Sequence, residues 1–237
     1  MKFLKLFQGE SKDKENAKEP MTQDQYLAEA HRIFQVSWDI LHNTNWRLEK
    51  HMENGDTVHS AHLPVVGKVF KAQGIVNMEP RALLNLMFCQ PDQFSKWNPV
   101  IVESRLLQNI DENTHISYQV TAERVGGLVA RRDFVILSHW AMRDNCYVLA
   151  GASVPHPAAP HHNRYVRGEN GPSCWIMRPV KESKSRCQLE WYLDTNLRGW
   201  LPQYVVDAAF SSIMLDNLNN VRAYAKKQNE QASSQSN

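Results

Sequence analysis

The sequence has few cysteines, almost no net charge and no long apolar run, and each shortage excludes a class of protein. Its four cysteines, Cys89, Cys146, Cys174 and Cys187, form no CxxC pair and no compact cysteine–histidine set. This argues against a disulfide framework or a structural zinc site. Lysine and arginine number 27 against 25 aspartates and glutamates, so the excess positive charge typical of nucleic-acid binding is missing. We expect a cytoplasmic protein with reduced thiols and no nucleic-acid partner.

The sequence also lacks a segment that could span a membrane, because no stretch offers the ~20 consecutive apolar residues that a bilayer requires. Residues 1–7 are interrupted by Lys5 and followed by polar residues, which matches neither a secretory signal nor a mitochondrial presequence. A weak interfacial tether and a frayed leader are the two interpretations of this segment. The polar segments 1–21 and 228–237 are expected to be disordered, which leaves 22–227 as one domain.

No pattern of catalytic or cofactor-binding residues stands out. His156, His161 and His162 lie in a proline-rich loop and can be interpreted as metal ligands or as solvated residues. No carboxylate or cysteine completes a metal set there, so we expect no metal. Gly126 and Gly127 lack the lysine and the following helix of a phosphate-binding loop. Without an acid–base pair at useful spacing, we expect neither an enzyme nor a cofactor.

The sequence does contain a long series of strand patterns between two amphipathic helices. Thr22 and Gln25 have the spacing of a capping box, ahead of an apolar helical stripe that runs to Leu41. A short helical patch begins at Pro80. The expected strands are 46–51, 57–63, 68–76, 101–107, 115–120, 133–140, 147–151, 175–179 and 188–194. This order predicts an α+β domain in which a strongly curved antiparallel sheet grips a helix.

The last helix is expected to begin at Pro202 and to carry a broad apolar stripe. The residues of the stripe are Val206, Phe210, Met214, Leu218, Val221 and Ala225. Such a stripe must be buried against the sheet. It can be ordinary core, or it can be a lid that leaves an apolar chamber between helix and sheet.

Three motifs in order give the sequence a family resemblance. They are GGLVARRDFV at 126–135, YVRGENGP at 165–172 and DTNLRGWLP at 194–202, with Trp46, GDTV at 55–58 and KWN at 96–98 in matching order. Together they resemble the START lipid-transfer family, in the subgroup of the steroidogenic acute regulatory protein and its late-endosomal relative. The resemblance covers roughly residues 22–227. It implies the START helix-grip fold, a sheet of about nine strands around an apolar tunnel closed by the C-terminal helix.

The resemblance also implies where a lipid and a gate would lie. The gate loop would be 122–131, with Gly126 and Gly127 supplying backbone freedom and Leu128 and Val129 supplying apolar contact. Arg132 and Asp133 match a pair of the family that we interpret as a fold-stabilising charge cluster. The expected lipid-binding residues are Phe94 and Asn98 from the resemblance, and Trp175, Trp191, Phe210 and Met214 from strand alternation and helix phase.

One departure from the family bears on the choice of lipid. Sterol-binding members carry a buried acid–arginine pair, and the matching positions here are Gln119 and Ser138. Loss of both charges together avoids a buried unpaired ion, and the two neutral side chains can still hydrogen-bond to a hydroxyl. A less polar tunnel floor also suits a longer rigid molecule, as in a carotenoid-binding member of the same subgroup.

We therefore expect a non-enzymatic carrier of one sterol or other rigid apolar lipid. It would act as a monomer, without cofactor or metal, in transient contact with the surface of organelle membranes. Three alternatives remain: a carotenoid-binding START protein, a lipid-sensing interaction module without transfer activity, and an enzyme of the related helix-grip cyclase type.

Overall fold

The computed structural model describes residues 21–235 apart from residues 65 and 182. The long strands are β1 (Arg47–His51), β2 (Thr57–Leu63), β3 (Gly67–Val76), β4 (Ile101–Asp111), β5 (Thr114–Thr121), β6 (Arg132–Arg143), β7 (Cys146–Ser153), β10 (Ser173–Val180) and β11 (Ser183–Leu193). The short strands are β8 (Val166–Arg167), β9 (Glu169–Asn170) and β12 (Thr195–Asn196). The helices are α1 (Gln23–Asn43), α2 (Pro80–Leu84), η1 (Asn85–Cys89), η2 (Pro91–Gln93), α3 (Phe94–Trp97), η3 (Val125–Gly127) and α4 (Gln203–Gln235).

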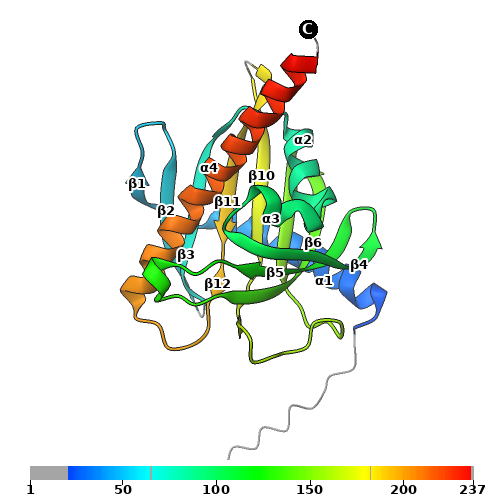
Figure 1. The fold of residues 1–237 in the computed structure, drawn as a ribbon, viewed down its shortest axis with the longest axis vertical. Helices are drawn as coiled ribbons and strands as arrows, with labels where there is room; N and C mark the ends of the chain where they lie inside the picture. The colour runs from blue at the N-terminus through cyan, green and yellow to red at the C-terminus, as the bar shows by residue number, and fades with distance from the viewer. Residues whose placement is uncertain (1–20, 65, 182, 236–237) are drawn as a thin grey trace, which may run out of the picture.

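The long strands form one antiparallel sheet in the order β1-β2-β3-β11-β10-β7-β6-β5-β4. The strand β8 joins it in parallel beside β6, and β9 pairs with β12 in a small separate sheet. Figure 1 shows α4 crossing one side of the curved sheet and α1 lying on the other. The predicted α+β helix-grip fold is confirmed, including all nine long strands. The two-residue strands were not predicted, because the alternation of apolar and polar residues can be recognised only over a longer segment.

Alternation along the strands gives the sheet two apolar faces. On β6, Phe134 and Ile136 belong to the core under α4, whereas Val135 and Leu137 belong to the core under α1. The helix α1 packs on β6, β7 and β10. It starts with the predicted capping box, in which the Thr22 amide donates to Gln25 at 2.7 Å and the Gln25 amide donates to Thr22 Oγ1 at 3.3 Å.

The apolar stripe of α4 is buried against the concave face of the sheet, as predicted. Phe210, Met214, Leu218, Val221 and Ala225 all belong to the core, which Val205 joins in place of the half-buried Val206. The predicted disordered tail differs from the structure, because α4 continues through residues 228–235. These residues include glutamines, a glutamate and an alanine, which favour helix once packing has fixed the preceding turns.

The predicted N-terminal leader, up to residue 20, lies outside the described part of the chain. Within the part that is described, no helix combines the length and the apolar character needed to span a membrane.

A buried ion pair fixes the C-terminal half of α4 to the β1–β2 loop. Asp56 is almost fully buried, and Arg222 Nη1 donates to its Oδ2 at 2.6 Å while Nη2 bonds to Oδ1. Arg222 Nε also donates to the Ile75 carbonyl at 2.8 Å. The pair lies across Gly74 of β3, where a Cβ would overlap the Asp56 carboxylate. Glycine at this position therefore makes room for the ion pair.

We expect Asp56→Asn to lower the free energy of unfolding by about 3 kcal/mol, because Arg222 would keep its charge without a carboxylate partner. Urea denaturation measures the change. The matched control is Asp207→Asn, which breaks the partly exposed pair of Asp207 with Lys68 at 2.9 Å and should cost less than about 1 kcal/mol. Equal losses in the two variants would contradict this ranking.

Candidate functional site

A cavity of about 180 Å³ lies between α4, the loop around η3 and the concave face of the sheet. Its wall is mainly aliphatic and aromatic. Six of the eight predicted lipid-binding residues line it: Phe94, Gln119, Ser138, Trp175, Trp191 and Phe210. The volume is below the roughly 300–1,000 Å³ typical of small-molecule sites. A ligand of sterol size therefore has to displace side chains or the loop when it binds.

The other two predicted residues lie behind the wall. Asn98 is fully buried, donates to Asn217 Oδ1 at 2.6 Å and accepts from Asn220 Nδ2 at 3.0 Å. Its polar atoms are thus used to attach the segment after α3 to α4. Met214 points into the core, and Ile213 and Asn217 line the cavity beside Phe210. Met214 therefore lies on the predicted stripe, but the cavity faces the side of α4 that carries Ile213 and Asn217.

Several lining residues were missed by the sequence analysis. Among them are Phe134 and Ile136 on β6 and Leu149 on β7. The signal was available for the first two, since they alternate with Ser138 on the same face of one strand. For Leu149 the strand register is needed, because Leu149 pairs with Trp140 of β6 and with Trp175 of β10.

Two stacked tryptophans form one wall of the cavity. Trp175 and Trp191 pair directly across β10 and β11, and their rings are parallel within 7° with centroids 4.2 Å apart. Neither indole nitrogen makes a hydrogen bond among the described residues. The wall is therefore a flat apolar surface that suits a rigid ring system.

Gln119 and Ser138 both line the cavity, but strand register separates them. Gln119 pairs with Phe134, whereas Ser138 pairs with His115, four residues along β5. At about 3.3 Å per residue their levels are roughly 13 Å apart. The expectation that both bind one hydroxyl is therefore corrected: they are two polar positions at different depths.

The predicted gate loop is a narrow turn at the edge of the cavity. Arg124 and Val129 exchange two backbone hydrogen bonds, of 2.9 and 3.1 Å, at its base. Gly126 and Gly127 have φ of 63° and 90°, with open space where a Cβ would point. Val129 lines the cavity and is buried, whereas Leu128 is 61% exposed. The other three predicted gate residues do not line the cavity.

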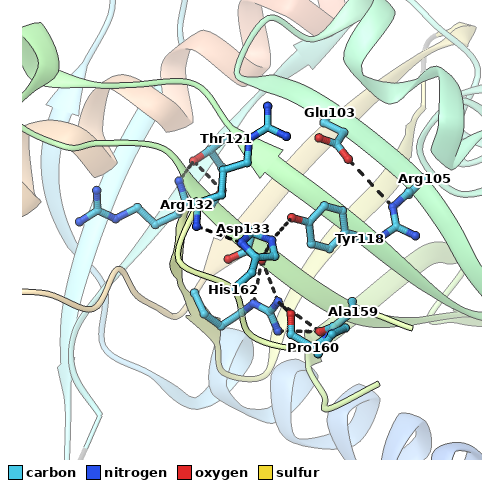
Figure 2. A network of polar contacts seen from close by, with 11 residues as sticks. Glu103, Arg105, Tyr118, Thr121, Arg132, Asp133, Ala159, Pro160 and His162 are labelled. Atoms are coloured by element: carbon cyan, nitrogen blue, oxygen red, sulfur yellow. Dashed lines mark hydrogen bonds and ion pairs between the residues drawn. The ribbon is translucent and has the colours of Figure 1, made fainter. Parts of the chain in front are cut away.

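The Arg132–Asp133 motif stabilises the strand beneath this loop. Arg132 Nε donates to the Leu197 carbonyl at 3.1 Å, and Asp133 accepts from Arg167 at 2.8 and 3.0 Å. Figure 2 shows Asp133 between Tyr118 and His162. Burial and the Asp133 carboxylate raise the pKa of Tyr118. Neither Arg132 nor Asp133 lines the cavity, so both act in the fold rather than on a ligand.

Two of the three histidines of the proline-rich loop, His156 and His162, make separate contacts. His156 Nε2 lies 3.0 Å from Gln108, and His162 Nε2 lies 3.2 Å from the Tyr118 hydroxyl. Among the described residues, no group of three His, Cys, Asp or Glu side chains is placed to hold a metal ion.

The cavity offers binding groups rather than an acid–base pair. Its described lining contains no aspartate, glutamate, histidine or lysine, and its one charged side chain is Arg124. The lining thiol of Cys174 is neutral at physiological pH, because burial raises its pKa to about 12. The site can therefore enclose an apolar molecule and bond to a few of its polar atoms.

A curved antiparallel sheet that encloses an apolar cavity beneath a long C-terminal helix defines the helix-grip class of ligand-binding folds. Within that class, the family model of the START domain matches residues 41–231, and the chain belongs to the START-domain family.

The chain is 33% identical over 198 residues to the steroidogenic acute regulatory protein, mitochondrial, of Danio rerio, covering 83% of this chain and 70% of that one. The same figures hold for the human protein of that name. Among solved structures, human StAR-related lipid transfer protein 5 superposes with a TM-score of 0.79 at 20% identity, over 88% of this chain and all of that one. Human STARD10 gives 0.70 at 16% identity, over 85% and 81%.

A carboxyl group beside the cavity wall makes stability depend on pH. Asp194 follows the lining residue Leu193 and packs against Gly171, and burial raises its pKa to about 6 from 3.8. Because the folded-state pKa is the higher one, the unfolded chain loses this proton first. Stability that is present below pH 4 is therefore lost as the pH rises through 6.

We expect Asp194→Asn to raise the free energy of unfolding at pH 7 by about 1 kcal/mol, after allowance for the partial exposure of the carboxyl. The gain should vanish below pH 4. Urea midpoints across this range measure it, with the exposed Glu123→Gln as control. A gain that did not change with pH would show that the ionisation of Asp194 is not its cause.

Proposed function

We propose that this protein binds one sterol-like lipid in its internal cavity and carries it between membranes without chemical conversion. The observation that carries the proposal is a mainly apolar cavity beneath α4 whose described lining has no acid–base pair. The family supports it, because one structural neighbour is named a lipid transfer protein and the relatives are named steroidogenic regulatory proteins. The protein needs no cofactor for this role and can act as a monomer.

Burial of apolar surface is sufficient to drive such binding. At about 25 cal/mol per Å², enclosing a few hundred square ångströms of lipid surface supplies several kcal/mol. Part of this free energy is spent on widening the cavity. The stacked Trp175 and Trp191 and the ring of Phe210, which stacks on Phe70 at 5.3 Å, are the large groups that would rearrange around the ligand.

The polar positions favour neutral hydrogen bonds to the ligand. Neither the Gln119 amide nor the Ser138 hydroxyl bonds to another described side chain, so both are free to bond to a lipid hydroxyl. A sterol has such a group at one end. A carotenoid is the alternative ligand, because the distance between Gln119 and Ser138 suits a long rigid molecule and neither position carries a charge.

Membrane contact would take place at the end where α4 begins. Trp200 is 92% exposed, Tyr204 is 72% exposed, and Leu128 of the gate loop is exposed as well. In Figure 1 the loop lies beside the orange N-terminal part of α4, which it contacts. Aromatic side chains of this kind favour the interface between water and lipid. We propose a cytoplasmic protein that touches organelle membranes transiently, through this end.

We expect replacement of Gly126 and Gly127 by Ala to slow lipid transfer between vesicles severalfold, because Ala resists their positive φ and restricts the loop. The matched control is Gly55→Ala in the β1–β2 loop, which has φ of 86° and equally open space. It should cost similar stability but leave transfer unchanged. Equal transfer rates in the two folded variants would remove the loop from the mechanism.

We expect Phe210→Asp to abolish sterol binding, because it places an unpaired carboxylate in the apolar wall. Asn219→Asp, on the exposed side of the same helix, is the control for the added charge. Binding of a fluorescent sterol delivered from cyclodextrin measures the effect, and thermal unfolding reports whether each variant is folded. A folded Phe210→Asp protein that binds normally would refute the proposed site.

A further inference from the structure

The polar side chains of the cavity fall into two groups. Asn217, Asn170, Thr195 and Ser173 already have partners inside the protein: Asn217 donates to the Ile213 carbonyl at 2.8 Å, and Thr195 donates to Asn170 at 2.7 Å. The second group consists of lining residues with a polar atom that bonds to nothing among the described residues. Its members are Ser138, Gln119, Arg124 and the two tryptophans, Trp175 and Trp191, whose indole N–H groups have no partner in the described part of the chain. Only this second group has hydrogen-bonding capacity left for a ligand.

Arg124 is the unexpected member of this group. It stands at the base of the gate loop, its side chain is 19% exposed, and its Nη1 donates to Asp216 Oδ2 of α4 at 3.0 Å. Its Nε is buried and has no hydrogen-bond partner among the described residues. A guanidinium keeps its charge and all its donors, and a buried donor without an acceptor is unfavourable. The ion pair with Asp216 holds the group in place, and it leaves the buried Nε–H without an acceptor among the described residues.

The unused donors lie at opposite ends of the cavity. Ser138 pairs with His115, and β5 runs six residues from there to its last residue, Thr121. At about 3.3 Å per residue this is roughly 20 Å, and Arg124, three residues after Thr121 in the chain, lines the cavity at the gate loop. Gln119 falls between them. A ligand that satisfies both ends must therefore carry polar atoms near both of its own ends.

We propose that the gate end of the cavity is a second polar subsite, in which Arg124 Nε donates a hydrogen bond to an acceptor on the lipid. The inference rests on the proposed function and deepens it. The ligand would be a rigid apolar molecule oxygenated at both ends, with one oxygen near Ser138 or Gln119 and the other near Arg124. Because arginine only donates, the gate-end group must be an acceptor: a hydroxyl, a carbonyl or a carboxylate. A carboxylate would add most to the affinity, since its hydrogen bond to arginine is charge-assisted and is therefore the strongest of the three.

Two kinds of molecule share this chemistry, and the experiment separates them. The first pair of probes is cholesterol and a cholesterol derivative with a hydroxyl or carboxylate at the end of its side chain. The second pair is a hydrocarbon carotene and its dihydroxylated counterpart. Affinities are measured by competition against a fluorescent sterol, for the whole chain and for folded variants checked by thermal unfolding. In the unaltered protein, the doubly oxygenated member of at least one pair should bind at least about tenfold more tightly.

The variants locate the preference. Arg124→Met removes the donor, and Arg124→Lys keeps a cation for Asp216 but lacks Nε. Both should reduce the preference to within about twofold while affinity for cholesterol stays nearly constant. Asp216→Asn is the control: it breaks the same ion pair but retains Nε, so the preference should persist.

Each alternative outcome has a distinct meaning. If cholesterol binds but the second oxygen brings no preference, the gate subsite is wrong and lipid carriage stands. If the preference is lost equally in Asp216→Asn, the ion pair rather than Nε is responsible, and the subsite as proposed is wrong. If no probe binds to the unaltered, folded protein, the proposed function fails together with the inference.

Discussion

The packing of one helical stripe against a strongly curved sheet is the constraint on which the rest of the structure depends. A sheet of nine long strands that curves this far cannot fill its own concave side. The stripe of α4 covers it, and Met214, Leu218 and Val221 are completely buried in doing so. Helix and sheet are in close contact around these three residues. Toward its start, Phe210 and Ile213 face Trp175 and Trp191 across a space that remains open.

Within the described part of the chain, three ion pairs attach α4 to the rest of the domain, and they differ in exposure to solvent along the helix. Arg222 with Asp56 is the buried pair at the C-terminal half. Lys68 with Asp207 and Arg124 with Asp216 are partly exposed pairs near the N-terminal half, where solvent weakens such interactions. The end of the helix with the weaker attachment is also the end that adjoins the gate loop and the exposed Trp200. This is the end at which we propose that the protein contacts a membrane.

Much of the fold could be predicted from the sequence, because helices and strands produce patterns among residues close together in the chain. The capping box of Thr22 and Gln25 fixes the start of α1, and alternation identifies every long strand. The site was harder. The separation of Gln119 from Ser138 depends on pairing register, and the free donor of Arg124 depends on Asp216, which lies 92 residues away. Neither relation can be recognised from the residues that are neighbours in the sequence. Met214 is a case of another kind, since it shares the predicted stripe with Phe210 and only the position of the open space beneath α4 decides which of the two lines the cavity.

The central claim is that the space beneath α4 holds a lipid, and native mass spectrometry of the protein purified from its natural source tests it most directly. The account predicts a single additional mass of one sterol-sized or carotenoid-sized molecule per chain, which organic extraction removes and chromatography identifies. The same species should be lost from the Phe210→Asp protein but kept by Asn219→Asp. A ligand-free mass for the natural protein, together with no uptake of sterol or carotenoid from vesicles, would contradict the account and indicate a filled core.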